Sequence, residues 1–134
     1  MGKKKIVVDS DFLVALYRQD DASHERATKL FGKVGQDEPE LVIINLVIQE
    51  TATVLSHRIG AAAARKFYEQ IRSLADIVIF VDEQLEEQSW QVFLKQSKKG
   101  TSFVDCANLA AIAFYNLEGI LSFDTFYPRK LRLS

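Results

Sequence analysis

The sequence predicts an α/β protein in which a mainly parallel β-sheet is flanked by helices. Short, continuously apolar runs alternate along the chain with longer segments of helical period. Continuous apolar runs are typical of strands that are covered on both faces, and parallel strands need helical crossovers between them. Acidic residues directly follow some of these runs, at the edge where open α/β sheets usually bind ligands.

The composition is that of an ordinary globular chain. With 134 residues, of which 48% are apolar, one domain spanning 1–134 is long enough to bury a core. The formal net charge of −1 means that a nucleic-acid site would need local basic patches. The lone Cys106 excludes an intrachain disulfide framework. No apolar run is long enough for a signal peptide or a membrane span, so we expect a cytoplasmic protein without membrane contact.

The first predicted strand, residues 6–8, is an apolar run that ends at Asp9. One or two helical turns are expected over residues 12–17. Ser10 or Asp11 is their expected N-cap, because either side chain can accept a hydrogen bond from a free backbone amide at the helix start.

A second helix is predicted over residues 20–31, and a loop containing glycine and proline follows over 32–40. His24 lies near the polar start of this helix and is expected to be a solvated side chain rather than a ligand. The apolar run 41–44 is the second strand, and a helix over 46–57 follows it directly.

Glu50 is unusual on that helix because its neighbours on the same face carry no charge. Val47 precedes it by one turn and Val54 follows it by one turn, and no lysine or arginine is available as a helical partner. An unpaired acid in an apolar row costs stability unless something neutralises it. Glu50 is therefore a candidate functional carboxylate.

The second half of the chain repeats the alternation of helices and strands. The predicted elements are an alanine-rich helix over 61–74, a strand over 77–81, a further helix over 82–95, a last strand over 120–121 and a short edge strand over 131–133. Trp90 is expected to pack in the core rather than to stack on a base.

The most apolar helix, over residues 102–116, precedes the last strand and carries Asp105 in its first turn. A helix that is apolar on most sides is typical of a buried position. Asp105 could simply complement the helix dipole, or pair with Ser102 as in a capping box. Three further acids in comparable settings favour a functional role.

Four acids are predicted to meet at the carboxyl edge of the sheet. Asp9 and Asp124 directly follow strands, and Glu50 and Asp105 belong to early turns of helices that should start at the same edge. Clustered carboxylates repel one another unless cations bind among them. Carboxylate oxygens suit Mg²⁺ or Mn²⁺, and no Cys/His spacing argues for zinc. Such a site suits phosphoryl chemistry, because bound ions can activate water without a histidine base.

These segments resemble the motifs of PIN-domain ribonucleases, particularly the VapC toxins of VapBC toxin–antitoxin pairs. Residues 7–16 resemble the opening strand and acid of the family, and Glu50 resembles its helical glutamate. Residues 102–111 and 122–126 are similar to its third and fourth motifs. Each motif is weak alone, but four in order over nearly the whole chain make a specific match.

The resemblance implies a three-layer α/β/α sandwich that cleaves RNA endonucleolytically with Mg²⁺ or Mn²⁺ as cofactor. It implies that Asp9, Asp105 and Asp124 are metal ligands and that Glu50 completes the catalytic set directly or through water. It also implies a homodimer and a cognate antitoxin protein that blocks the cleft.

Three positions depart modestly from the family pattern. Asp11 stands where Ser or Asn is frequent, Ser122 replaces the commoner Thr, and Phe126 sits one place early. The extra acid at Asp11 could alter metal occupancy, but we favour the N-cap role.

Contact with RNA would have to come from local cations. Two groups lie near the predicted acids in the sequence and are candidates for phosphate contact: Lys98 and Lys99, and Arg129, Lys130 and Arg132. The lysines at 3–5 begin the first strand and are expected at the opposite edge.

Two alternatives to a nuclease are open. A catalytically silent PIN-like interaction domain would have the same fold without turnover. A receiver-like signalling module also gathers acids at the carboxyl edge of a parallel sheet to bind Mg²⁺, and Asp82 could be its phosphoacceptor. That module needs a lysine at the end of a later strand, and none is evident.

Overall fold

The computed structural model describes residues 2–134 and contains one parallel sheet. Its strands are β1 (Lys5–Val8), β2 (Glu40–Ile44), β3 (Ile77–Ile79) and β4 (Gly119–Leu121). The helices are α1 (Ser10–Tyr17), α2 (His24–Gly35), α3 (Asn45–Arg58), α4 (Ala61–Leu74), α5 (Glu83–Leu94) and α6 (Phe103–Tyr115). Within residues 2–134, no helix has the length and apolar character needed to cross a membrane.

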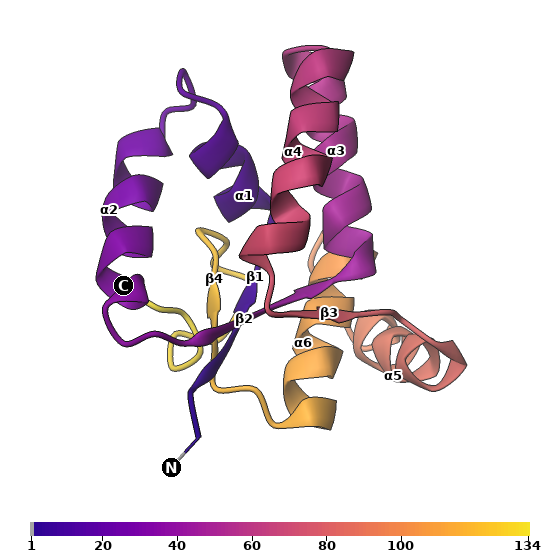
Figure 1. The fold of residues 1–134 in the computed structure, drawn as a ribbon. Coiled ribbons are helices and arrows are strands. Elements are labelled where there is room, and N and C mark those ends of the chain that lie inside the picture. The colour runs from indigo at the N-terminus through magenta and orange to yellow at the C-terminus, as the bar shows by residue number, and fades with distance from the viewer. Residues whose placement is uncertain (1) are drawn as a thin grey trace.

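The strand order, β3-β2-β1-β4, determines where the helices lie. From β1 to β3 each new strand is added on the same side of the sheet, and the chain then returns past β1 to add β4 on the other side. Right-handed crossovers therefore put α1–α4 on one face of the sheet and α5–α6 on the opposite face. Figure 1 shows α3 and α4 above β3 and α5 and α6 below it. The predicted three-layer α/β/α sandwich is confirmed, and the strand order reverses at β1 and β4. A reversal of this kind opens a crevice at the carboxyl ends of the two strands.

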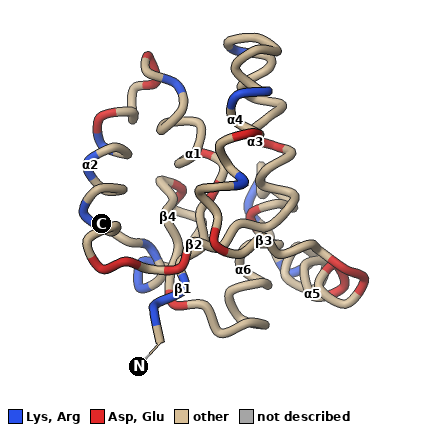
Figure 2. The backbone as a smooth tube through the Cα atoms, in the orientation of Figure 1, with Lys and Arg blue, Asp and Glu red and all other residues tan. Residues whose placement is uncertain are grey.

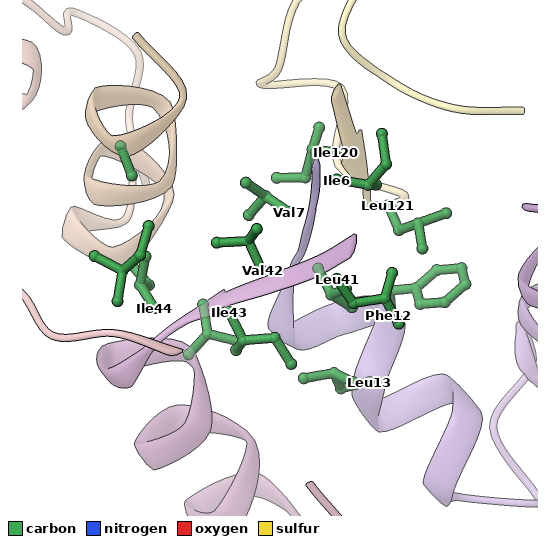
Figure 3. Close-up of a cluster of buried hydrophobic side chains, with 14 of the residues drawn as sticks. Ile6, Val7, Phe12, Leu13, Leu41, Val42, Ile43, Ile44, Ile120 and Leu121 are labelled. Carbon is green, nitrogen blue, oxygen red and sulfur yellow. The ribbon is translucent and has the colours of Figure 1, made fainter. Parts of the chain in front are cut away.

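The strands are buried on both faces, as their unbroken apolar runs predict. Successive side chains of a strand point to opposite faces, yet Val42, Ile43 and Ile44 are all completely buried. Figure 3 shows Leu13 of α1 pointing toward Ile43 of β2, with Phe12 beside Leu41. This packing anchors α1 immediately after β1, so its first residues lie at the carboxyl edge.

The start of α2 differs from the prediction of a helix beginning at residue 20. The carboxylate of Asp21 accepts a hydrogen bond from the Ser23 amide at 2.8 Å, and this turn delays the helix to His24. His24, expected to be a solvated side chain, is partly buried. Its Nδ1 lies 2.7 Å from the Ala15 carbonyl oxygen, which ties the start of α2 to α1.

Three other predictions are corrected near the edges of the molecule. Trp90 is not a core residue, because 44% of it is exposed and its ring packs beside Phe103 at 4.5 Å between centroids. The third strand ends at Ile79, and Phe80 beyond it is exposed. The expected edge strand of the tail is reduced to one parallel bridge between Arg132 and Ile120.

The close approach of the tail to β4 leaves no room for a side chain at Gly119. A Cβ atom there would lie 2.9 Å from the carbonyl oxygen of Leu131. We expect Gly119→Ala to lower the free energy of unfolding by about 1–3 kcal/mol, because the tail must be displaced. Urea denaturation measures this change.

Gly32→Ala is the matched control for that substitution. Gly32 lies inside α2, and an added Cβ would meet no atom of the described part of the chain within 4 Å. Alanine there should raise the free energy of unfolding by up to about 1 kcal/mol. Equal stabilities of Gly119→Ala and the wild type would show that the tail is not packed as described.

Candidate active site

Asp9 is the central residue of the acidic cluster. It directly follows β1, and its backbone amide donates to the Leu121 carbonyl at 3.0 Å, so strand pairing with β4 continues to this residue. Its carboxylate accepts a hydrogen bond from the Ser10 amide at 2.8 Å and caps α1. The prediction of Ser10 or Asp11 as the N-cap is wrong, because α1 begins immediately after the strand. Asp9 is only 2% exposed.

Two further polar side chains donate to the Asp9 carboxylate. The Ser122 hydroxyl donates to Oδ2 at 2.8 Å, and the Asn108 amide nitrogen donates to Oδ1 at 3.1 Å. Burial, followed by the nearby charge of Asp11, raises the pKa of Asp9 to about 7, although the bonds from Ser122 and Ser10 oppose this rise. Asp9 therefore has a buried charge that its hydrogen bonds compensate only in part.

Asp11 points across the crevice toward the loop after β4 instead of capping α1. Its carboxylate accepts hydrogen bonds from the Phe123 amide at 3.1 Å and from the Ser122 hydroxyl at 3.3 Å. Burial raises its pKa to about 6, and the charge of Asp124 contributes to the rise. The favoured N-cap role is wrong, and Asp11 is a fifth acid of the cluster.

Asp105 and Asp124 approach Asp9 from other segments. Asp105 lies in the first turn of α6, where burial and the charges of Asp9 and Asp124 raise its pKa to about 7. The Ser102 hydroxyl caps α6 by accepting from the Val104 amide at 3.1 Å. The carboxylate of Asp124 accepts from the Phe126 amide at 2.9 Å. Both acids therefore contribute to the same negative region.

Glu50 reaches the cluster from α3. Its carboxylate accepts a hydrogen bond from the Ser10 hydroxyl at 2.8 Å, and its charge contributes to the raised pKa of Asp9. It lines a groove of about 300 Å³ together with Asp11, Arg58 and Phe123. Glu50 thus lies at the wall of the crevice. No lysine or arginine lies one helical turn before or after it in α3.

The four predicted acids are therefore brought together in space, and the donors fit a hard divalent cation. All are carboxylates, the ligand type that Mg²⁺ and Mn²⁺ prefer, and burial and mutual repulsion raise the pKa values of several of them. As the side chains stand, residues 2–134 contain no group of three acidic, histidine or cysteine side chains arranged to coordinate one ion. The hydroxyl groups of Ser10, Ser122 and Tyr127 each donate to one oxygen of a carboxylate in the cluster, and further lone pairs of these carboxylates stay free for a cation.

Sequence reasoning missed two buried polar residues of this site, Asn108 and Tyr127. Asn108 had a signal, since it is a polar residue in an apolar helix and lies one turn after Asp105, on the same face. Tyr127 had none, because a tyrosine in a loop after Asp124 does not indicate by itself where its hydroxyl points.

The tail cations do not lie where their closeness to Asp124 in the sequence suggested. Arg132 pairs beside Ile120 in the middle of β4, and the turn before it returns the chain toward the start of that strand. Arg129 and Lys130 therefore lie away from the carboxyl ends, and Figure 2 shows the basic tail near the start of β1. This placement does not favour them as the phosphate contacts for which they were candidates.

The exposed Lys98 and Lys99 lie in the loop before α6 and stay predictions for RNA contact. Two arginines that sequence reasoning did not select lie beside the site. Arg58 lines the groove beside Glu50, and the guanidinium of Arg26 lies 4.6 Å from the centre of the Phe123 ring.

Comparison with known proteins agrees with this architecture. The PIN domain family matches residues 6–130. The chain is 32% identical over 124 residues to the 23S rRNA-specific endonuclease VapC20 of Mycobacterium tuberculosis, covering 89% of this chain and 88% of that protein.

Two solved structures share the fold. The crystal structure of Mycobacterium tuberculosis VapC20, a toxin that cleaves the sarcin-ricin loop, has a TM-score of 0.78 and 30% identity, with 89% of each chain covered. VapBC2 from Rickettsia felis, bound to a DNA fragment from their promoter, has a TM-score of 0.66 and 12% identity, with 96% of each chain covered, and supports the fold alone. The chain therefore belongs to the PIN-domain family and is a VapC-like member of it.

Proposed function

We propose that this chain is a divalent-metal-dependent endoribonuclease and the toxin of a toxin–antitoxin pair. The observation that carries the proposal is the meeting of Asp9, Glu50, Asp105 and Asp124 at the crevice between β1 and β4. The similarity to VapC20, an endonuclease of 23S rRNA, supports RNA as the substrate class and ribosomal RNA as the first substrate to test.

In this proposal Asp9, Asp105 and Asp124 are the ligands of Mg²⁺ or Mn²⁺, and Glu50 completes the site directly or through water. The chemistry that such an ion supplies when bound is activation of water and neutralisation of charge at the phosphodiester. The Ser10 hydroxyl orients Glu50 through a 2.8 Å hydrogen bond, and Asp9 is oriented by its three donors. Lys98 and Lys99 are proposed contacts to the RNA phosphates.

We further propose that 1–134 acts as one domain in the cytoplasm, as a homodimer that a cognate antitoxin inhibits. The description of VapC20 as a toxin supports the existence of an inhibiting partner. The acidic groove beside Glu50 and Asp11 is an accessible part of the site that such a partner could cover.

The two alternatives differ in their support. The receiver-like alternative does not agree with membership of the PIN-domain family, and Asp82 instead caps α5, accepting from the Leu85 amide at 2.8 Å. The catalytically silent interaction domain shares the fold and is separated from a nuclease only by measuring turnover.

The test is cleavage of end-labelled ribosomal RNA by the purified chain, with Mn²⁺ or with EDTA. We expect discrete internal cuts in Mn²⁺ and none in EDTA, because in the proposed mechanism the bound ion supplies the activation of water and the neutralisation of charge at the phosphodiester. Titration calorimetry with Mn²⁺ in the absence of RNA is the second readout. A folded protein that neither binds Mn²⁺ nor cuts RNA would favour the silent interaction domain.

A further inference from the structure

We infer that Asn108 and Tyr127 are positioning residues, which together form a hydrogen-bonded bridge between the carboxylates of Asp9 and Asp105. The inference rests on the proposed function, since it assigns a role in orienting two of the proposed metal ligands. Neither residue is itself a proposed ligand.

The bridge is a continuous chain of three hydrogen bonds. The Asn108 amide nitrogen donates to Asp9 Oδ1 at 3.1 Å and to the Tyr127 hydroxyl at 3.1 Å. The Tyr127 hydroxyl in turn donates to Asp105 Oδ1 at 3.1 Å. The two carboxylates are thereby joined although one follows β1 and the other lies in α6.

The numbers of donor hydrogens determine which group donates and which accepts in each bond of the bridge. A primary amide has two N–H hydrogens, and both are used, one on Asp9 and one on Tyr127. A phenol has one hydrogen, so Tyr127 accepts from Asn108 through an oxygen lone pair and donates its single hydrogen to Asp105. Each bond therefore fixes the orientation of the next group.

The burial of the bridge argues against a role in packing alone. Asn108 and Tyr127 are 0% and 1% exposed, and the buried Asn108 carbonyl oxygen has no hydrogen-bond partner among residues 2–134. A buried amide with an unsatisfied oxygen costs stability, and an apolar side chain of similar volume would avoid that cost. Asn108 instead directs its amide hydrogens to the Asp9 carboxylate and the Tyr127 hydroxyl.

Tyr127 connects Asp105 to the loop after β4. Asp105 is in the first turn of α6, where its side chain is only partly buried and accepts a hydrogen bond from the Tyr127 hydroxyl. Tyr127 belongs to the loop after β4, the loop that also carries Asp124. Loss of the phenol oxygen would free the Asp105 carboxylate to rotate without removing any proposed ligand.

The test is Tyr127→Phe, which removes one oxygen and keeps the ring. We expect titration calorimetry to show Mn²⁺ affinity reduced by about tenfold, the lower end of effects reported for groups that orient metal ligands. The Mn²⁺ concentration for half-maximal RNA cleavage should rise by the same factor, whereas the KM for RNA at saturating Mn²⁺ should not change.

Tyr17→Phe is the matched control. Tyr17 is a partly buried tyrosine, its ring packs edge-on against Phe67 at 5.1 Å, and its hydroxyl makes no side-chain hydrogen bond within the described residues. This variant should keep wild-type Mn²⁺ affinity. Because Tyr127 acts through Asp105, adding Tyr127→Phe to Asp105→Asn should weaken Mn²⁺ binding no further.

The possible results separate this inference from the proposed function. A wild type that binds Mn²⁺ and cuts RNA, with a Tyr127→Phe variant of unchanged Mn²⁺ affinity, would overturn the bridge alone. Circular dichroism showing Tyr127→Phe unfolded would also overturn it, because the phenol oxygen would then support the fold. A folded wild type without Mn²⁺ binding or cleavage would overturn both proposals.

Discussion

Asp105→Asn is expected to reduce RNA cleavage by at least about a hundredfold while the protein stays folded. Asparagine keeps the size of the side chain but removes the charge on which a divalent ion depends. In the folded protein this charge is unfavourable, because burial and the charges of Asp9 and Asp124 raise the pKa of Asp105 to about 7. Without metal, the variant should therefore be as stable as the wild type or more stable.

Cleavage of labelled ribosomal RNA in Mn²⁺ measures the loss of activity, and urea denaturation in EDTA measures stability. Asp37→Asn is the control, because it removes one negative charge from an exposed position in the loop before β2. It should leave both quantities unchanged. An Asp105→Asn variant that unfolds would show that the acid is structural, and one that cuts RNA as fast as the wild type would remove it from the catalytic set.

The metal-free protein is expected to become more stable as the pH falls from 8 to 5. The pKa values of Asp9 and Asp105 are raised to about 7 and that of Asp11 to about 6, from an ordinary value of 3.8. Between these values the folded state binds more protons than the unfolded state, so the free energy of unfolding decreases with rising pH. Asp9, the most buried of the three, should contribute about 2–3 kcal/mol to this change.

Urea denaturation in EDTA at several pH values measures this trend. Asp9→Asn should lose the largest part of it, because the variant has no proton to release at that position. Mn²⁺ should stabilise the wild type strongly at pH 8, where the carboxylates are ionised, and only weakly at pH 5, where protons compete. A free energy of unfolding that is constant from pH 8 to pH 5 in EDTA would contradict the cluster as described.

Much of the fold could be predicted because it depends on short-range patterns. The helix expected over 61–74 agrees with α4, and the apolar run 41–44 agrees with β2 apart from one residue. Even the meeting of four acids distant in the sequence could be predicted, since parallel strands place their carboxyl ends at one edge. The start of α2 could not, because it depends on a side-chain turn at Asp21 that competes with helix formation.

The sequence by itself therefore determined the α/β class, the family and the edge at which Asp9, Glu50, Asp105 and Asp124 gather. Only the tertiary structure decided that Asp9 caps α1, that Asp11 joins the acids, that Tyr127 and Asn108 bridge two of them, and that the basic tail turns away. The physical reason is that periodicity and chain direction act locally. The direction of a polar side chain, in contrast, depends on which donors other segments bring within about 3 Å of it.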